Sequence, residues 1–277
     1  MSATLEQITF VVAVNNDQIL SRNFLSSPCI QQIRPEHLLL QRGHASAAFA
    51  YNDALERARS EIVIFAHQDM YFPQDWISSL ESALSYLESH DPNWGVLGSF
   101  GVTARKDRYG HVYSSGLGVI GKPVDKPIPV QTLDEIVLIV RKSSHLRFDT
   151  ALSGFHFYGS DLCLEASAKG MRNYVIPGFC VHNTQMYPVL PAEFYACYRQ
   201  FRSKWLRCLP VHTSCITVSR FNTPFIIRKL REWYITHIKQ QRLEITRLPN
   251  PATALTTLQA CGTCQASETA HESIPTI

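Results

Sequence analysis

The stretch Glu61-Ile-Val-Ile-Phe-Ala-His67-Gln68-Asp69 decides the fold of this chain. Residues 62–65 are apolar without a break, which is typical of a strand that is covered on both faces of a sheet. A helical pattern follows directly, from Asp75 to Leu87. In open α/β sheets, ligands bind beyond the carboxyl ends of the strands. We therefore expect an α/β fold with a site where this strand ends.

His67 and Asp69 stand two residues apart at that strand end. If the backbone stays extended, both side chains point to the same side, where they can face one cation or one phosphate. A His-x-Asp triplet also arises by chance, and such a triplet can simply hydrogen-bond a turn. The triplet alone leaves both interpretations open.

The segments before this strand follow the same alternating order. Residues 8–14 form a continuous apolar run that ends in Asn15-Asn16-Asp17, which predicts a first buried parallel strand with a polar end. Residues 38–40 predict the next strand, and the Ala-rich residues 45–59 predict a helix. This helix leads directly into the strand at residue 61, so the resulting order is strand, helix, strand.

The second half of the domain is less regular. Glycines and prolines interrupt residues 104–130, which favours a hairpin or flexible loop. We predict strands at 94–102, 135–141 and 174–177, and a helix at 160–169 that a Ser-Asp cap opens and Gly170 closes.

Composition limits the class of protein. The chain has 277 residues, 45% of them hydrophobic, which is enough for one α/β domain with a smaller appendage. The net charge is +3, and residues of both charges are mixed along the chain. No nucleic-acid motif occurs, so we expect no nucleic-acid partner. No signal peptide begins the chain, and no apolar run approaches the roughly 20 residues that span a bilayer. We expect a cytoplasmic protein.

The eight cysteines stand mostly in apolar contexts, which is typical of reduced, buried thiols. Cys261 and Cys264 form the only CxxC pair, and we interpret it as incidental because no second pair completes a zinc site. No GxGxxG or GxxxxGK[ST] loop occurs, which disfavours the usual dinucleotide and nucleotide phosphate sites.

Several motifs lie apart in the sequence, and their order and spacing match those of a known protein family. They are Phe10-Val-Val-Ala-Val-Asn-Asn16, Ala50-Tyr-Asn-Asp-Ala-Leu-Glu-Arg-Ala58, the 61–69 stretch, Arg147-Phe-Asp149, Gly154-Phe-His-Phe-Tyr-Gly-Ser-Asp-Leu-Cys-Leu164, and Tyr174-Val-Ile-Pro177 with His182. Over about residues 8–185 the chain resembles nucleotide-sugar glycosyltransferases of the family-2 type, most closely the subgroup related to a streptomycin-biosynthesis protein. The resemblance implies a GT-A fold, which is a Rossmann-like, mostly parallel central sheet flanked by helices.

The resemblance also implies a divalent metal. In that family a strand-end Asp-x-Asp holds the cation that bridges the donor diphosphate, but here His67 replaces the first Asp. Asp69 is then the expected metal ligand. Oxygen ligation suits Mg²⁺ or Mn²⁺, and an imidazole ligand favours Mn²⁺. His182 takes the place of a second metal or diphosphate ligand, although a histidine after a strand is often only a loop residue.

Asp161 occupies the place of the family's catalytic base. The first turn of a helix favours an ionised carboxylate, whereas local sequence alone favours a simple helix cap. His156 and Tyr158 would line the acceptor pocket or pack in the core. The donor would contact Val14, Asn15, Asn16, Asn52, His67 and Gln68. The acidic residue that reads uracil in many relatives is missing from Leu40-Gln41-Arg42, which leaves the nucleotide open.

These features predict an inverting, metal-dependent glycosyltransferase that uses a nucleotide-diphosphate-sugar donor. The acceptor, whether saccharide, lipid or protein, cannot be read from the sequence. The alternative is a non-catalytic sugar- or nucleotide-binding module on a degenerate GT-A scaffold. A sugar-1-phosphate nucleotidylyltransferase ranks third, because its Gly-rich signature near the first strand is missing.

We divide the chain into a glycosyltransferase domain at 1–187, a helical extension at 188–247 and a disordered tail at 248–277, where Pro, Thr, Ala, Ser and Gln dominate without periodicity. Within the extension, residues 225–239 mix apolar and basic side chains at helical spacing. This pattern predicts either a peripheral membrane contact or a helix packed on its own domain.

Overall fold

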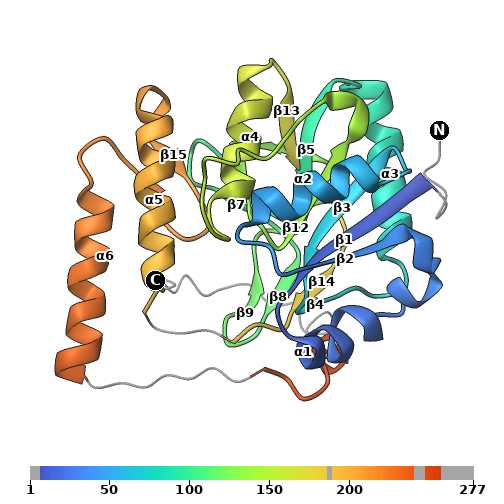
Figure 1. Cartoon of the computed structure of the whole chain (residues 1–277), viewed down its shortest axis with the longest axis horizontal. Coiled ribbons are helices and arrows are strands. Elements are labelled where there is room, and N and C mark those ends of the chain that lie inside the picture. The colour runs from blue at the N-terminus through green and yellow to red at the C-terminus, as the bar shows by residue number, and fades with distance from the viewer. Residues whose placement is uncertain (1–6, 186–188, 240–246, 257–277) are drawn as a thin grey trace, which may run out of the picture.

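A seven-stranded sheet forms the centre of the computed structural model, which describes residues 7–185, 189–239 and 247–256 (Figure 1). Its strand order is β10 (Ile128–Val130), β13 (Arg172–Val175), β5 (Trp94–Gly98), β12 (Val137–Arg141), β3 (Ile62–His67), β1 (Ile8–Val14) and β2 (Leu38–Arg42). Only β12 and β10 run against the other strands. The prediction of a mostly parallel central sheet is therefore confirmed.

The sheet separates two apolar cores. Along β1, Phe10 and Val12 face one core and Val11 faces the other, because successive side chains on a strand point to opposite faces. Helix α3 (Trp76–His90) covers the first face, while α2 (Ala47–Arg57) and α4 (Tyr158–Ala168) cover the second. Burial on both faces explains why β1 and β3 are largely apolar; within β1, Thr9 is the exception, and its hydroxyl donates to Ser60 at 2.9 Å.

The strand predicted at 94–102 is two strands. β5 stays in the central sheet, whereas β6 (Phe100–Val102) leaves it to pair with β7 (Arg108–Gly110) and β11 (Thr132–Leu133). The break falls at Ser99, which belongs to neither strand. The single-strand prediction was wrong, because both pieces are apolar and only their separate partners distinguish them.

The glycine- and proline-rich region contains the predicted hairpin, formed by β8 (Val112–Ser114) and β9 (Gly118–Ile120). β8 also pairs with β14 (Cys180–His182), which pairs with β4 (Met70–Tyr71). A second, four-stranded sheet thus carries β4 and β14 to the end of β3. The last residues of the region predicted as a hairpin or loop instead form β10, which pairs with β13 in the central sheet.

Two element predictions shift in position. Helix α4 begins at Tyr158 after Phe157, whose φ of 66° is left-handed, and no side chain caps it. The predicted Ser-Asp cap was therefore wrong. The last predicted strand lies slightly earlier, as β13. In the first half, α1 (Asp17–Arg22) follows β1 directly and is capped by Asn16.

The C-terminal region contains the predicted helices, α5 (Ala192–Lys204) and α6 (Thr223–Tyr234), which continues as a π-helical turn (Ile235–Lys239). A short hairpin of β15 (Val211–His212) and β16 (Thr217–Val218) was not predicted. Phe157 and Leu164 pack with Phe194 and Phe201 of α5 in one buried cluster. Helix α6 is the outermost element on this side (Figure 1).

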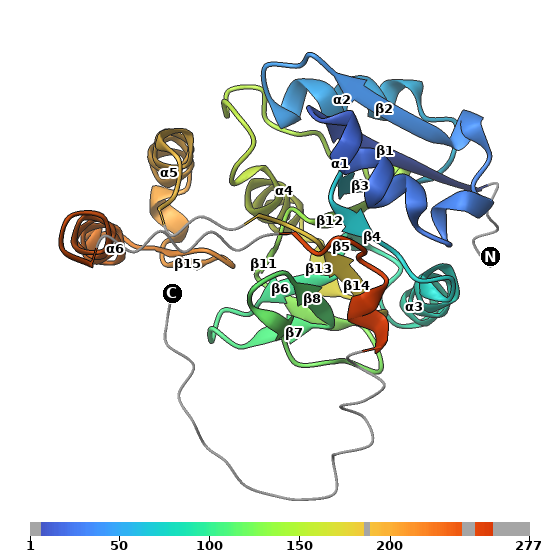
Figure 2. The ribbon, with the colours of Figure 1, turned by 90° about the horizontal axis from the view of Figure 1, so that it is seen from below.

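The segment 247–256 returns to the main body, red in Figure 2, beside β4 and β14. Leu248 and Ala254 pack near Tyr71 and Val181, and Ala254 is only 1% exposed. The prediction of disorder was therefore wrong for residues 248–256. The few apolar side chains of this segment pack against the folded domain. Residues 257–277, with Cys261 and Cys264, lie outside the described residues.

Candidate metal and nucleotide site

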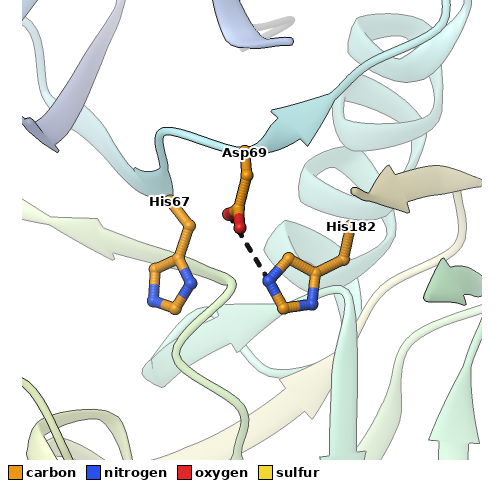
Figure 3. A group of neighbouring side chains, drawn as sticks. All are labelled: His67, Asp69 and His182. Atoms are coloured by element: carbon orange, nitrogen blue, oxygen red, sulfur yellow. Dashed lines mark ion pairs between the residues drawn. The ribbon is translucent and has the colours of Figure 1, made fainter. Parts of the chain in front are cut away.

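Three polar side chains meet where β3, β4 and β14 come together (Figure 3). His67 ends β3, Asp69 immediately precedes β4, and His182 ends β14. Their ligand atoms all lie within 4.8 Å of one another, and His182 Nε2 lies 3.4 Å from Asp69 Oδ1. The backbone at Gln68 and Asp69 forms a turn instead of staying extended. Convergence depends on this turn and on the pairing of β4 with β14, not on strand alternation.

The electrostatics of the group keep the Asp69 carboxylate ionised. Asp69 is only 8% exposed, and its burial alone would raise its pKa. The charge and hydrogen bond of His182, with the charges of His67 and Arg247, instead hold the pKa of Asp69 at about 2. Burial lowers the pKa of His67, which keeps this imidazole neutral and able to donate a lone pair. Burial also acts to lower the pKa of His182, but Asp69 outweighs it and raises that pKa.

Tyr158 orients His67. The phenol oxygen lies 3.1 Å from His67 Nε2 and donates to the carbonyl of Glu135 at 3.4 Å. This contact leaves Nδ1 as the His67 nitrogen that can face the other two ligands. Tyr158 is 4% exposed, so it contacts His67 from the protein interior. The predicted role in an acceptor pocket finds no support in this position.

Two imidazoles and one carboxylate make a mixed nitrogen and oxygen donor set. Such a set suits transition-metal ions such as Mn²⁺ better than Mg²⁺, which prefers oxygen ligands and retained water. The residues present therefore fit a divalent cation of the kind expected from the sequence.

The predicted donor residues at the ends of β1 and β3 lie together. Gln68 Oε1 accepts from the backbone N–H groups of Asn15 at 3.2 Å and Asn16 at 3.0 Å. Asn16 in turn caps α1 by accepting from Gln18 and Ile19. Gln68 thus ties two neighbouring strand ends together, and Asn15 and Asn16 are exposed beside the metal-capable group. Val14 is 8% exposed at the same edge.

Asn52 is occupied elsewhere. Its Nδ2 donates to the carbonyl of Phe148 at 2.8 Å, and its Oδ1 accepts from the Phe148 N–H at 3.0 Å. This paired contact holds the loop at Phe148 against α2, so we assign Asn52 a structural role. His156, half-buried, lies against Phe194 with ring centroids 5.3 Å apart, at the same end of α4 as Tyr158.

Asp161 is enclosed by α5 and the residue that follows it. The residue is 1% exposed, and its Oδ1 accepts from Trp205 Nε1 at 2.7 Å and lies 2.8 Å from Lys204 Nζ. Lys204 also pairs with Asp149 at 2.7 Å and Glu165 at 2.8 Å. Burial raises the pKa of Asp161, although Lys204 and Trp205 act to lower it. Both oxygens are engaged, which is the environment of an anchor between helices and not of an accessible base.

Glu135 is a nearby carboxyl group that sequence reasoning treated only as the start of a strand. Its Oε1 accepts from the N–H of Gly159 at 3.3 Å, at the N-terminus of α4. Burial, with a contribution from Asp134, raises the pKa of Glu135 to about 8. Together with Ser160 and Phe194, Glu135 lines a small cavity. The sequence does not predict this environment, because a glutamate before an apolar strand is common. The environment follows from the contact of Glu135 with the N-terminus of α4 in the folded protein.

An α/β protein with a metal-capable site at the carboxyl edge of its sheet is the class that the fold and the site define. Residues 9–191 match the model described as "Glycosyltransferase like family", and the chain belongs to this family. The sheet and the family together confirm the GT-A fold class expected from the sequence.

Individual relatives are distant. "ATP synthase subunits region ORF 6" of Fuscovulum blasticum is 28% identical over 169 residues, which span 58% of this chain and 66% of that protein. Among solved structures, S. aureus TarS 1–349 in complex with UDP has a TM-score of 0.47 and 14% identity, with 85% of this chain and 73% of that chain covered. The mannosyltransferase PcManGT from Pyrobaculum calidifontis, in complex with GDP-Man and Mn²⁺, has a TM-score of 0.44 and 15% identity. The match covers 94% of this chain and 76% of that chain.

Proposed function

We propose that this protein is a glycosyltransferase that binds a nucleotide-diphosphate sugar and a divalent cation at the edge where β1, β3 and β14 end. The observation that carries the proposal is the convergence of His67, Asp69 and His182 inside the segment that matches the family. The inverting mechanism, the metal dependence, the cytoplasmic location and the narrower streptomycin-related subgroup all belong to this proposal.

The residues of the chain have distinct tasks in this proposal. His67, Asp69 and His182 would hold the cation, and Tyr158 keeps His67 in position. When bound, a divalent cation neutralises the charge that develops on the leaving diphosphate. Gln68 fixes the backbone of Asn15 and Asn16, against which the nucleotide would lie. This preorganisation avoids an ordering cost during the reaction.

Transfer itself would be a single displacement. The acceptor hydroxyl oxygen forms a bond to the anomeric carbon, the bond from that carbon to the diphosphate oxygen breaks, and the hydroxyl proton passes to a carboxylate of the protein. The sequence motif makes Asp161 this base. We favour Glu135, because its carboxylate lines a small cavity with Ser160 and Phe194, whereas both oxygens of Asp161 are engaged. A base functions best with a pKa near the working pH.

Calorimetric titration tests the proposal directly. We expect the full chain to bind Mn²⁺, and to bind one of UDP, GDP, ADP, CDP or dTDP only when Mn²⁺ is present. Loss of a partner that merely orients a metal ligand costs about 10–100-fold in affinity, so Asp69→Asn is expected to cost at least as much. Asp75→Asn, at an exposed position before α3, is the matched control. If no nucleoside diphosphate binds with Mn²⁺, the donor-site proposal fails.

Replacement of an expected aspartate by His67 favours a second candidate, a non-catalytic nucleotide- or sugar-binding module. Both candidates bind the nucleotide. They differ in turnover, because a transferase slowly hydrolyses its donor even without an acceptor. A protein that binds the nucleotide with Mn²⁺ but never releases it from any donor sugar would be the binding module.

The outer face of α6 supports membrane contact as part of the proposal. Six apolar side chains on α6 and the turn after it are 46–62% exposed, namely Ile226, Ile227, Leu230, Trp233, Tyr234 and Ile238. The inner face is fixed, since Phe225 stacks on Tyr198 and Glu232 accepts from the hydroxyl of Tyr195. Exposed Arg231 lies among the apolar residues, whereas the Lys229 ammonium lies over the ring of Tyr195, 3.3 Å from the ring centroid. An apolar face with aromatic and basic residues is typical of helices that lie on anionic lipid.

A further inference from the structure

A segment far outside the family match reaches the metal-capable group. Asn183, directly after β14, holds this segment by accepting from the N–H of Leu248 at 2.7 Å and donating to the carbonyl of Leu248 at 3.0 Å. Asn183 is itself fixed, because it is 2% exposed and also bonded to Ser115 and Asn23. The residue before Leu248 is therefore held at a defined place beside the site.

That residue is Arg247, and its guanidinium is only partly used. Nη1 donates to Gln185 Oε1 at 3.2 Å, while Nη2 lies 3.8 Å from Asp69 Oδ2, which is beyond hydrogen-bond length. Nε is buried, and no group of the described residues accepts from it. The Arg247 side chain is 30% exposed and Nη2 lies beyond hydrogen-bond length of Asp69, so Nη2 can donate to a further partner.

The local charge calls for an anion. Asp69 faces His67, His182 and Arg247, and Asp134 acts on both histidines from further away. With a divalent cation held by the three ligands, positive charge exceeds the negative charge of Asp69 and Asp134. A guanidinium edge presents two parallel donors that match two phosphate oxygens.

We propose that Arg247 binds the diphosphate of the nucleotide donor together with the cation, as a positioning residue that the C-terminal segment supplies. The inference rests on the proposed function, because it assumes that a nucleoside diphosphate occupies this site. It adds a contact from beyond residue 191, where the family match ends. Residues 67, 69 and 182 would thus hold the metal, and residue 247 would add a contact to the diphosphate.

The test compares the wild type with Arg247→Gln and Arg247→Lys by calorimetry in Mn²⁺, with the nucleoside diphosphate that the wild type binds best and with its monophosphate. We expect Arg247→Gln to lose about 10–100-fold in diphosphate affinity and Arg247→Lys to lose less. The smaller affinity for the monophosphate should change little. Affinity for Mn²⁺ alone should not fall, because the substitution removes a positive charge beside Asp69.

Arg57→Gln is the matched control, since Arg57 is an exposed, ion-paired arginine on α2. Thermal melting of each variant checks that the fold is intact. Equal diphosphate affinity in wild type and Arg247→Gln would overturn the role of Arg247 and leave the proposed function standing. Absence of diphosphate binding by the wild type would instead overturn the proposed function, and the role of Arg247 with it.

Discussion

Glu135 is a residue whose chemistry departs strongly from that of a free side chain. Its pKa of about 8 means that the folded protein keeps a proton which the unfolded chain loses near pH 4.5. Because the folded state binds more protons between these values, the stability from this group is fully present below about pH 4.5 and is lost as pH rises to about 8.

We therefore expect Glu135→Gln to remove one source of alkaline destabilisation. Relative to wild type, the free energy of unfolding of the variant should rise by up to about 1.4 kcal/mol per pH unit between pH 5 and 8. Urea unfolding of both proteins across this range measures the difference. Glu56→Gln, at an exposed site on α2, is the control. Parallel stability curves for wild type and Glu135→Gln would show that Glu135 titrates normally.

The positions of single site residues were predictable where they depend on the end of a strand. His67 and Asp69 follow a buried run and His182 follows a shorter one, so their proximity to a sheet edge could be expected from the sequence. The partners of Asp161 could not be expected, because Lys204 and Trp205 belong to another part of the chain. A basic residue on a helix usually faces solvent, and nothing local distinguishes Lys204.

At the scale of elements, α4 and α5 are joined by an ion cluster around Lys204, in which Asp161 is buried and the other members are partly exposed. Removal of Asp161 would leave Trp205 Nε1 without its acceptor, while Lys204 would keep Asp149 and Glu165. We expect Asp161→Ala to lower the free energy of unfolding by about 2 kcal/mol, less than for a charge left wholly unpaired. Urea unfolding measures this loss, with Asp75→Ala as the control.

Nucleotide binding separates this anchoring role from catalysis. The folded fraction of Asp161→Ala should bind Mn²⁺ and nucleoside diphosphate as the wild type does, because the metal-capable group lies on other elements. Normal stability combined with loss of sugar transfer would contradict the anchoring role. Asp161 would then be the catalytic base that the sequence motif implies.

Long apolar elements were the predictable ones. β1 and β3 are buried on both faces, so each shows as a largely apolar run. The three-residue strands β7, β8 and β9 are too short for a periodic signal, and distant partners define them. The start of α4 was misplaced for a related reason. Its first residue follows a left-handed phenylalanine, a conformation for which the sequence gives no warning.

At the scale of the whole molecule, α6 lies at one side, away from the central sheet (Figure 1). Its apolar face consists of exposed side chains such as Ile227 and Leu230. Within the described residues, no helix is both long enough and apolar enough to cross a membrane. If α6 lies on lipid, association should depend on both the apolar face and the anionic charge of the surface. Each basic side chain near such a surface contributes about 1 kcal/mol.

We expect the protein to float with vesicles that contain phosphatidylglycerol, and to float less with pure phosphatidylcholine or at high salt. The double variant Ile227→Asp with Leu230→Asp should remain in the soluble fraction. Phe49→Asp, at an exposed aromatic residue on α2, controls for added charge and should float normally. Equal flotation of the α6 variant and the wild type would exclude this face as the lipid contact.

The pairing of β4 with β14 gives the metal-capable group one more consequence. His182 stands directly opposite Met70, next to Asp69, while His67 belongs to the central sheet. An ion bound by all three would cross-link the two sheets and close a long loop of the chain. Binding restricted to the folded state adds its free energy to folding. The supply of metal would thus govern how long each folded copy survives, as well as whether it can work.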